Sequence, residues 1–180
     1  MKNAILVISL VLLLCFTFGC QNKAEKEELE KFRDQAKVEE QNKALVKPSL
    51  EAWRKGEFEL FRETVAPGVV WYMPSRTIST RSVEELIEAG KMIRKSFPDI
   101  TFSIEEIFAA GDRVIFRYIE KGTQLEEYAG IPATGKKYEI SGIDIWRIEN
   151  GKIVEVRSDN DMLGLMMQLG MELRPKEVKK

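Results

Sequence analysis

The order of the sequence patterns predicts an α+β fold. Apolar residues recur with helical spacing up to about Phe97, and alternating segments separated by short turns follow from Ile100 onward. Consecutive strands joined by hairpin-type turns favour an antiparallel sheet, whereas a parallel sheet would need helices between its strands. An Asn150-Gly151 pair between two alternating segments supports this assignment, since both central residues of a type I′ turn need positive φ.

Three helical segments are predicted before the strands. The first, 40–53, is interrupted by Pro48, which removes one backbone hydrogen bond, so we expect a bend or a restart there. The second is 57–65. The third begins after Ser82, because Ser82-Val83-Glu84-Glu85 fits a capping box, and it extends to about Phe97. Residues 68–73 read as a strand, and residues 75–81 as a polar loop.

The remaining residues predict four strands of one antiparallel sheet and a short apolar helix. The strands are 100–108, 114–124, about 138–149, and one that follows Gly151; the helix ends at Gly170. The last strand carries Glu155, Arg157, Asp159 and Asp161 at every second position, which places all four on one face. That face either meets water or lines a polar pocket.

The N-terminal residues indicate export. Lys2 precedes an apolar run, 4–18, that is too short for a spanning helix and has the form of a secretory signal peptide. Gly19-Cys20 at its end resembles a bacterial lipobox, in which Cys20 is acylated; an ordinary signal peptide or an uncleaved anchor is the alternative. We therefore expect a signal peptide at 1–19 and a lipid-anchored protein of the bacterial cell envelope, facing the periplasm or the outside.

The rest of the chain divides into three predicted parts. Residues 20–39 are rich in Lys, Glu, Gln and Ala and read as a charged helical tether, or as a backward extension of the first domain helix. Residues 40–173 form the domain, and residues 174–180 form a basic tail. The chain has 28 basic and 29 acidic residues, so its charge gives no case for nucleic acid as a partner.

The residue types present restrict the chemistry. Histidine is absent, which excludes a Ser-His-Asp triad, His-ligated zinc and an imidazole base. Cleavage before Cys20 removes Cys15, and the remaining thiol is used for lipid, so neither a disulfide nor a catalytic thiolate is expected. Carboxylates, Arg, Tyr and Trp remain as candidate functional groups.

Several motifs, in order, carry a resemblance to a known family. They are Glu51-Ala52-Trp53, Phe97-Pro98-Asp99, Gly122-Thr123, the 130–136 loop, Gly151-Lys152-Ile153-Val154-Glu155, Asp161 and Leu163-Gly164-Leu165. From about Glu40 to Gly170 the chain resembles the SnoaL-like polyketide cyclase (ester cyclase) family of the nuclear transport factor 2-like superfamily. The resemblance implies a cone-shaped, strongly curved antiparallel sheet with about three N-terminal helices around an apolar cavity.

The resemblance also implies a site. A family aspartate near the end of the last long strand removes a proton next to a carbonyl, without metal or cofactor. The matching position is Asp161, with Asp159 as the alternative. Two positions depart from the family: Gln124 stands where many members have His, and Arg157 where many have Trp. Arg157 would either pair with Asp161 or bind an anionic ligand group.

Three further residues are candidate ligand contacts. Tyr72 lies on the first strand, where either it or Trp71 faces the interior. Asp144 and Trp146 share one face of the long strand, which is either the cavity face or the solvent face.

Two functions are compatible with these features. One is a cofactor-free cyclase or isomerase acting on a small, mostly apolar carbonyl compound. The other is a lipid-anchored, non-catalytic protein that binds a small hydrophobic ligand. The superfamily also suggests a homodimer formed through the outer face of the sheet.

Overall fold

The computed structural model describes residues 2–74, 77–172 and 174, with side chains described for 23–74, 79–172 and 174. The chain divides into two units, residues 1–38 and residues 39–180. The predicted signal peptide and Cys20 lie outside the residues with described side chains, and the predicted tail lies almost entirely outside them. Within the described residues, no helix is long and apolar enough to cross a membrane.

The first unit is helical. Helix α1, Lys2–Lys55, begins in it and continues into the second unit. The described side chains of residues 23–38 are exposed, including Leu29 and Phe32, and Lys23 lies 4.0 Å from Glu27 one helical turn later. A segment with so few apolar side chains is stabilised mainly by its own backbone hydrogen bonds and by such charge pairs.

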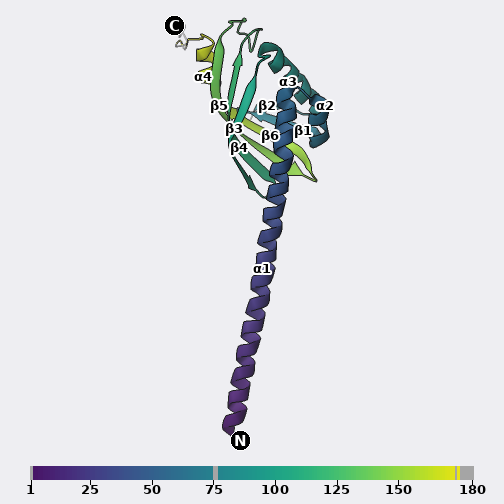
Figure 1. The fold of residues 1–180 in the computed structure, drawn as a ribbon, viewed down its shortest axis with the longest axis vertical. Helices are drawn as coiled ribbons and strands as arrows, with labels where there is room; N and C mark the ends of the chain where they lie inside the picture. Colours follow the sequence, from purple (N-terminus) through teal and green to yellow (C-terminus); the bar gives the residue numbers. More distant parts are fainter. Residues whose placement is uncertain (1, 75–76, 173, 175–180) are drawn as a thin grey trace, which may run out of the picture. The chain divides into compact units, whose positions relative to one another are not determined.

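The second unit is built on a six-stranded curved sheet (Figure 1). Its strands, in sequence order, are β1 Val65–Met73, β2 Thr77–Thr80, β3 Thr101–Ala110, β4 Arg113–Thr123, β5 Lys137–Glu149 and β6 Lys152–Asn160. Their spatial order is β2-β1-β6-β5-β4-β3. The predicted α+β class with a curved sheet is confirmed.

The sheet is mixed, so the expectation of a purely antiparallel sheet is wrong. Strands β3 to β6 form an antiparallel meander, as predicted, but β1 pairs with β6 in parallel, with Trp71 opposite Val156. Strand β2, within the predicted polar loop, pairs with β1 at the edge. Pairing between strands far apart in the chain leaves no local signal, and a short polar edge strand resembles a loop.

The helices are α1, α2 Phe58–Thr64, α3 Val83–Ser96 and α4 Met162–Gln168. Helix α1 runs through Pro48 without a break, so no new helix starts there. Val46 and Leu50 are both buried, and this packing on either side of the proline holds the helix together despite the missing N–H.

Two local signals are confirmed at atomic level. Ser82 caps α3 by accepting a hydrogen bond from the Glu85 N–H, and Glu85 in turn accepts from the Arg81 N–H. Asn150 and Gly151 have φ of 50° and 71°, as a type I′ turn between β5 and β6 requires.

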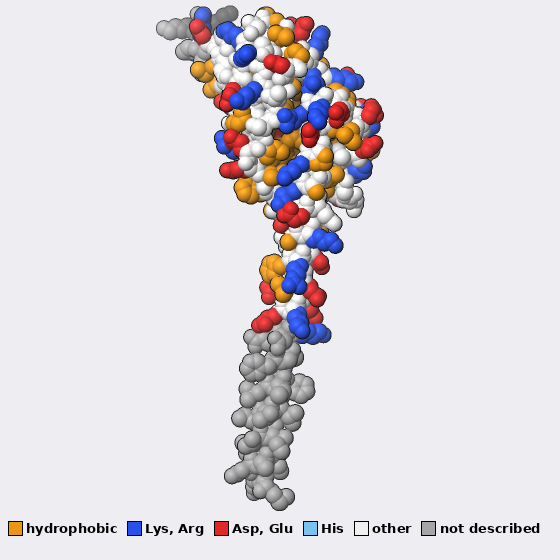
Figure 2. Space-filling view, in the orientation of Figure 1, with side chains coloured by type: hydrophobic (Ala, Val, Ile, Leu, Met, Phe, Trp, Pro, Cys, Tyr) orange, Lys and Arg blue, Asp and Glu red, His pale blue; other side chains and the backbone are white. Residues whose placement is uncertain are grey.

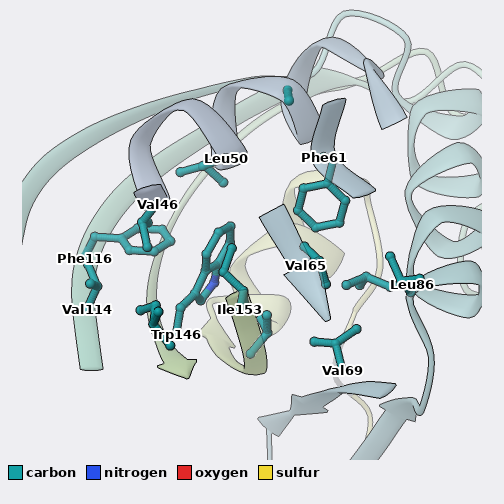
Figure 3. Packing of buried hydrophobic residues seen from close by; sticks show 14 of the residues in the cluster. Val46, Leu50, Phe61, Val65, Val69, Leu86, Val114, Phe116, Trp146 and Ile153 are labelled. Carbon is teal, nitrogen blue, oxygen red and sulfur yellow. The ribbon is translucent and has the colours of Figure 1, made fainter. Parts of the chain in front are cut away.

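Two groups of buried side chains fill the space between the helices and the concave face of the sheet. In the larger group, Trp146 of β5 packs with Phe116 of β4, Val46 and Leu50 of α1, and Ile153 of β6 (Figure 3). In the smaller group, Phe97 follows α3 and packs with Tyr138 of β5 and Leu165 of α4. These two groups leave a cavity between them.

The surface of this unit is polar and mixed in sign. On the face seen in Figure 2, acidic and basic side chains alternate with small apolar patches. This pattern agrees with the near balance of charge in the sequence.

Candidate functional site

An internal cavity lies on the concave face of the sheet. Helices α1 and α3 contribute Leu50, Trp53, Leu86 and Ile93, and α4 contributes Leu165. The cavity volume is about 90 Å³, counted as the space that the centre of a water molecule can occupy. Since one water needs roughly 10–15 Å³ by this measure, the cavity has room for several waters or one small ligand.

The central polar group of the cavity is Asp144 of β5. The residue is 7% exposed, and its Oδ2 accepts a hydrogen bond from Trp146 Nε1 at 3.0 Å. Oδ1 has no hydrogen-bond partner of good geometry among the described residues. Burial raises the pKa of Asp144 to about 7, although Trp146 and the nearby hydroxyls of Ser158 and Tyr118 favour its anion. A carboxyl group of this kind can exchange a proton near neutral pH.

Tyr118 of β4 reaches across to β5 beside Asp144. It stands opposite Gly142 in the register, and a Cβ at Gly142 would lie well within 3.0 Å of the phenol ring and hydroxyl. The glycine therefore provides the space in which the ring lies over the neighbouring strand. Burial and the adjacent Asp144 raise the pKa of Tyr118, so its hydroxyl stays protonated and can donate a hydrogen bond.

Strands β1 and β6 supply the next polar groups. Trp71 Nε1 donates to Ser158 Oγ at 2.9 Å, and both residues line the cavity with Asn160. The amide oxygen of Asn160 is buried and unpaired within the described structure. Unpaired oxygens on Asp144 and Asn160 leave hydrogen-bonding capacity for a ligand or water.

Glu120 of β4 is the second carboxyl group on the cavity wall. It accepts a hydrogen bond of 2.6 Å from the Tyr138 hydroxyl. Burial raises the pKa of Glu120, while the Tyr138 hydrogen bond lowers it.

The charged face of β6 does not line the cavity. Arg157, Asp159 and Asp161, which the resemblance places at the pocket, therefore lie outside the cavity wall. Val156, Ser158 and Asn160 line the cavity, and the alternate residues lie on the opposite face. Arg157 forms an ion pair with Glu155 at 2.7 Å and lies over the Tyr72 ring, 4.7 Å from its centre. Asp159 is exposed.

Asp161 has a different position from the one expected. It follows β6 as the N-cap of α4, where its exposed carboxylate accepts a hydrogen bond from the Gly164 N–H at 2.7 Å. It does not line the cavity and forms no ion pair with Arg157 among the described contacts. This carboxylate satisfies a helix-terminal N–H that would otherwise lack a partner.

Of the other candidate ligand contacts, two line the cavity and two do not. Asp144 and Trp146 line the cavity together, whereas Tyr72 faces away and its neighbour Trp71 takes the inner position. Gln124 is fully buried but outside the cavity; its Nε2 donates to the Ile131 carbonyl, and its Oε1 accepts from Thr134. Gln124 therefore organises the 125–136 loop, which carries the cavity residue Tyr128.

Sequence reasoning missed Tyr118, Glu120, Ser158 and Asn160. A usable signal existed in β4, where Val114, Phe116, Tyr118 and Glu120 alternate, and the apolar members mark the inner face. A glutamate at the end of such a face is unusual and indicates a polar spot in the interior.

Comparisons with known proteins agree with this architecture. The family profile described as SnoaL-like polyketide cyclase matches residues 43–169. No curated protein matches the chain.

Solved structures share the fold. A candidate SnoaL-like polyketide cyclase from Jannaschia sp. CCS1 has a TM-score of 0.68 at 22% identity, covering 76% of this chain and 96% of that one. IdmH, a candidate polyketide cyclase from Streptomyces antibioticus, has a TM-score of 0.64 at 28% identity, with 72% and 99% covered. AclR, a candidate hydroxylase from Streptomyces galilaeus, has a TM-score of 0.64 at 26% identity, with 72% and 95% covered.

The matched segment contains every strand and the whole cavity wall. The chain belongs to the SnoaL-like polyketide cyclase family.

Proposed function

We propose that the domain catalyses proton abstraction from a small, mostly apolar carbonyl compound, with Asp144 as the general base. The supporting observation is the Asp144 carboxyl group, which is buried at an apolar cavity and has one unpaired oxygen. Its pKa of about 7 makes the anion available at neutral pH while keeping it a stronger base than an exposed aspartate. Asp144 replaces Asp161 and Asp159 in this role because neither lines the cavity.

The chemistry follows from the neighbours of Asp144. Its carboxylate accepts a proton from the carbon next to the substrate carbonyl, and the electrons of the broken C–H bond move toward the carbonyl oxygen. The Tyr118 hydroxyl, protonated and beside Asp144, is the group suited to donate a hydrogen bond to that oxygen. Aromatic and aliphatic walls from Trp71, Phe102 and Leu86 exclude water and accommodate an apolar skeleton.

Hydrogen–deuterium exchange in β-tetralone, a small benzo-fused cyclic ketone with acidic benzylic α-protons, tests this proposal. In D₂O buffer, the protein should accelerate loss of the α-proton NMR signals above the protein-free rate. Asp144→Asn should reduce the acceleration by roughly a hundredfold or more. The matched control is Asp161→Asn, which changes an exposed carboxylate and should stay within a few-fold of wild type.

The same assay separates the alternative function. A non-catalytic binding protein would bind β-tetralone without accelerating exchange, and Asp144→Asn would then have no rate effect. No acceleration by wild type, or equal acceleration by the Asp144 variant, contradicts the enzymatic proposal.

We also propose that the protein is an exported lipoprotein acylated at Cys20. The support is the sequence alone: an apolar run after Lys2, followed by Gly19-Cys20. Cys20→Ser should move the protein from the membrane fraction to the soluble fraction of an expressing bacterium. Unchanged membrane retention contradicts this proposal.

A homodimer through the outer sheet face is proposed from the residues on that face. Phe108, Ile115 and Ile145 are cross-strand neighbours on β3, β4 and β5, and Phe108 is 59% exposed. Such a row fits a second copy of the same surface. Sedimentation velocity should give a dimer for wild type and a monomer for Phe108→Lys, while a monomeric wild type contradicts the proposal.

A further inference from the structure

The Asp144 carboxyl group has hydrogen-bond donors on its own strand and on the neighbouring strand β6. Trp146, two residues later on β5, donates its indole N–H directly to Oδ2. On β6, Ser158 stands opposite Asp144 in the strand register, and both residues line the cavity. Cross-strand partners on one face of an antiparallel pair have Cβ atoms about 4.5–5.5 Å apart, so the Ser158 hydroxyl is within reach of the carboxyl group.

The Ser158 hydroxyl is oriented by a residue from a third strand. Trp71 of β1 donates its indole N–H to Ser158 Oγ at 2.9 Å. An indole nitrogen donates a hydrogen bond but accepts none, so Ser158 is the acceptor in this contact and keeps its own hydrogen for another partner. The parallel pairing of β1 with β6, with Trp71 opposite Val156, brings the two side chains together.

Asp144 is the acceptor that suits this hydrogen. Asn160, two residues further along the same face of β6, has a buried side-chain oxygen without a partner in the described part of the chain, so Ser158 does not donate to it. Burial raises the pKa of Asp144, and the Ser158 hydroxyl is one of the groups that oppose this rise, as a donor to the carboxylate does. Trp71, Ser158 and Asp144 thus form a hydrogen-bond chain that ends at the carboxylate.

A carboxylate that acts as a base benefits from a second fixed contact. Rotation about the bond between Cβ and the carboxyl carbon is soft in aspartate, so the one hydrogen bond from Trp146 leaves the plane of the group free to turn. A donor on another strand restrains that rotation. A carboxylate has about four lone-pair positions, so Trp146 and Ser158 together still leave positions for a ligand proton.

The other titratable groups on the cavity wall, among the described residues, are Tyr118, Glu120 and Tyr128. Tyr118 favours the Asp144 anion by hydrogen bonding, whereas the charge of Glu120 raises the pKa of Asp144. The helices contribute only aliphatic and aromatic side chains to the described wall, without lysine or arginine. Neutral hydrogen-bond donors therefore stabilise and orient the anion.

We propose that Trp71 and Ser158 are positioning residues for Asp144. Trp71 orients the Ser158 hydroxyl, and that hydroxyl donates its hydrogen to the Asp144 carboxylate and fixes the plane of the group in the cavity. Neither residue exchanges a proton with the substrate. Since the orientation of the carboxylate affects a reaction only if Asp144 is the base, this inference rests on the proposed function.

The test is a ¹³C NMR titration of the Asp144 carboxyl carbon in the full chain, with Asp144→Asn identifying the signal. Wild type should titrate near pH 7. Ser158→Ala should raise the midpoint by about one pH unit, because the anion loses a hydrogen bond. Ser158→Thr keeps a hydroxyl at this position and should keep the wild-type midpoint. The matched control is Ser103→Ala, which removes an exposed hydroxyl of β3 and should leave the midpoint unchanged.

Trp71→Phe removes the indole N–H but keeps an aromatic ring on the wall. It should also raise the midpoint, and the double variant with Ser158→Ala should match Ser158→Ala alone, because Trp71 acts through Ser158. The pH midpoint of β-tetralone exchange should move by the same amount as the NMR midpoint in each variant. Residues that contributed only to folding would lower the free energy of unfolding without moving either midpoint.

The outcomes separate this inference from the proposed function. An unchanged NMR midpoint in Ser158→Ala overturns the inference whether or not Trp71→Phe folds. An unchanged midpoint in folded Trp71→Phe, or additive shifts in the double variant, also overturns it. NMR midpoints that move as expected while wild type gives no exchange support the hydrogen-bond chain and overturn the proposed function.

Discussion

Replacing Asp144 by asparagine should stabilise the protein relative to wild type as the pH rises. Burial raises the pKa of Asp144 from 3.8 to about 7 in the folded protein. Between these two values the folded state holds a proton that the unfolded state has lost. The contribution of Asp144 to the free energy of unfolding of wild type therefore falls as the pH rises through that window. Above the window this contribution is constant. The asparagine side chain of the variant does not titrate and lacks this dependence.

The pKa difference sets the size of the effect. A change of about three pH units corresponds to roughly 4 kcal/mol, at 1.36 kcal/mol for each unit. Replacing the carboxyl group by an amide also changes the free energy of unfolding by an amount that does not depend on pH. This amount cancels when the stability difference between the variant and wild type is compared at two pH values. The variant should therefore gain up to about 4 kcal/mol over wild type between about pH 4 and pH 8.

Urea denaturation at several pH values, followed by circular dichroism, measures this difference. Linear extrapolation gives the free energy of unfolding for both proteins under each condition. A stability difference that stays constant across this range, or that changes in favour of wild type, would refute the argument that Asp144 is held in a low-dielectric site.

Three other substitutions have distinct expected effects. Gly142→Ala should lower the free energy of unfolding by about 1–3 kcal/mol, because its Cβ meets the Tyr118 ring; urea denaturation that shows no loss contradicts the packing described here. Asp161→Ala should lower it by about 1 kcal/mol through loss of the α4 cap while leaving β-tetralone exchange unchanged, and a large loss of exchange would restore Asp161 as a catalytic candidate. Arg157→Leu, which removes a partly exposed ion pair, should change stability by less than about 1 kcal/mol and leave exchange unaffected; reduced exchange would place Arg157 at the site.

The sequence was sufficient for the local features of the fold. The Asn150-Gly151 turn and the Ser82 cap depend on residues adjacent in the chain, and both have the predicted geometry. The parallel pairing of β1 with β6 depends on contacts between distant segments, for which a single sequence carries no direct signal.

The site was harder to predict because alternation gives two faces but does not identify the inner one. In β6 the alternation leaves the charged face open between water and a pocket, and the family resemblance favours the pocket. The inner face instead carries Ser158 and Asn160, which need less desolvation than ionised side chains. In β5 the inner face carries Asp144 and Trp146, while Ile143 is 47% exposed. The buried residues Tyr138, Ile140 and Ile148 lie on the same face as Asp144 and Trp146, so the inner face is marked by the whole strand rather than by its central residues.

The pH dependence of β-tetralone exchange tests the central claim most directly. If Asp144 is the base, the wild-type exchange rate above the protein-free rate should rise with pH through a midpoint near 7 and level off, following the ionised fraction of its carboxyl group. Asp144→Asn should show no such rise. The same rate below and above the midpoint in wild type, or the same profile in the variant, would contradict the account.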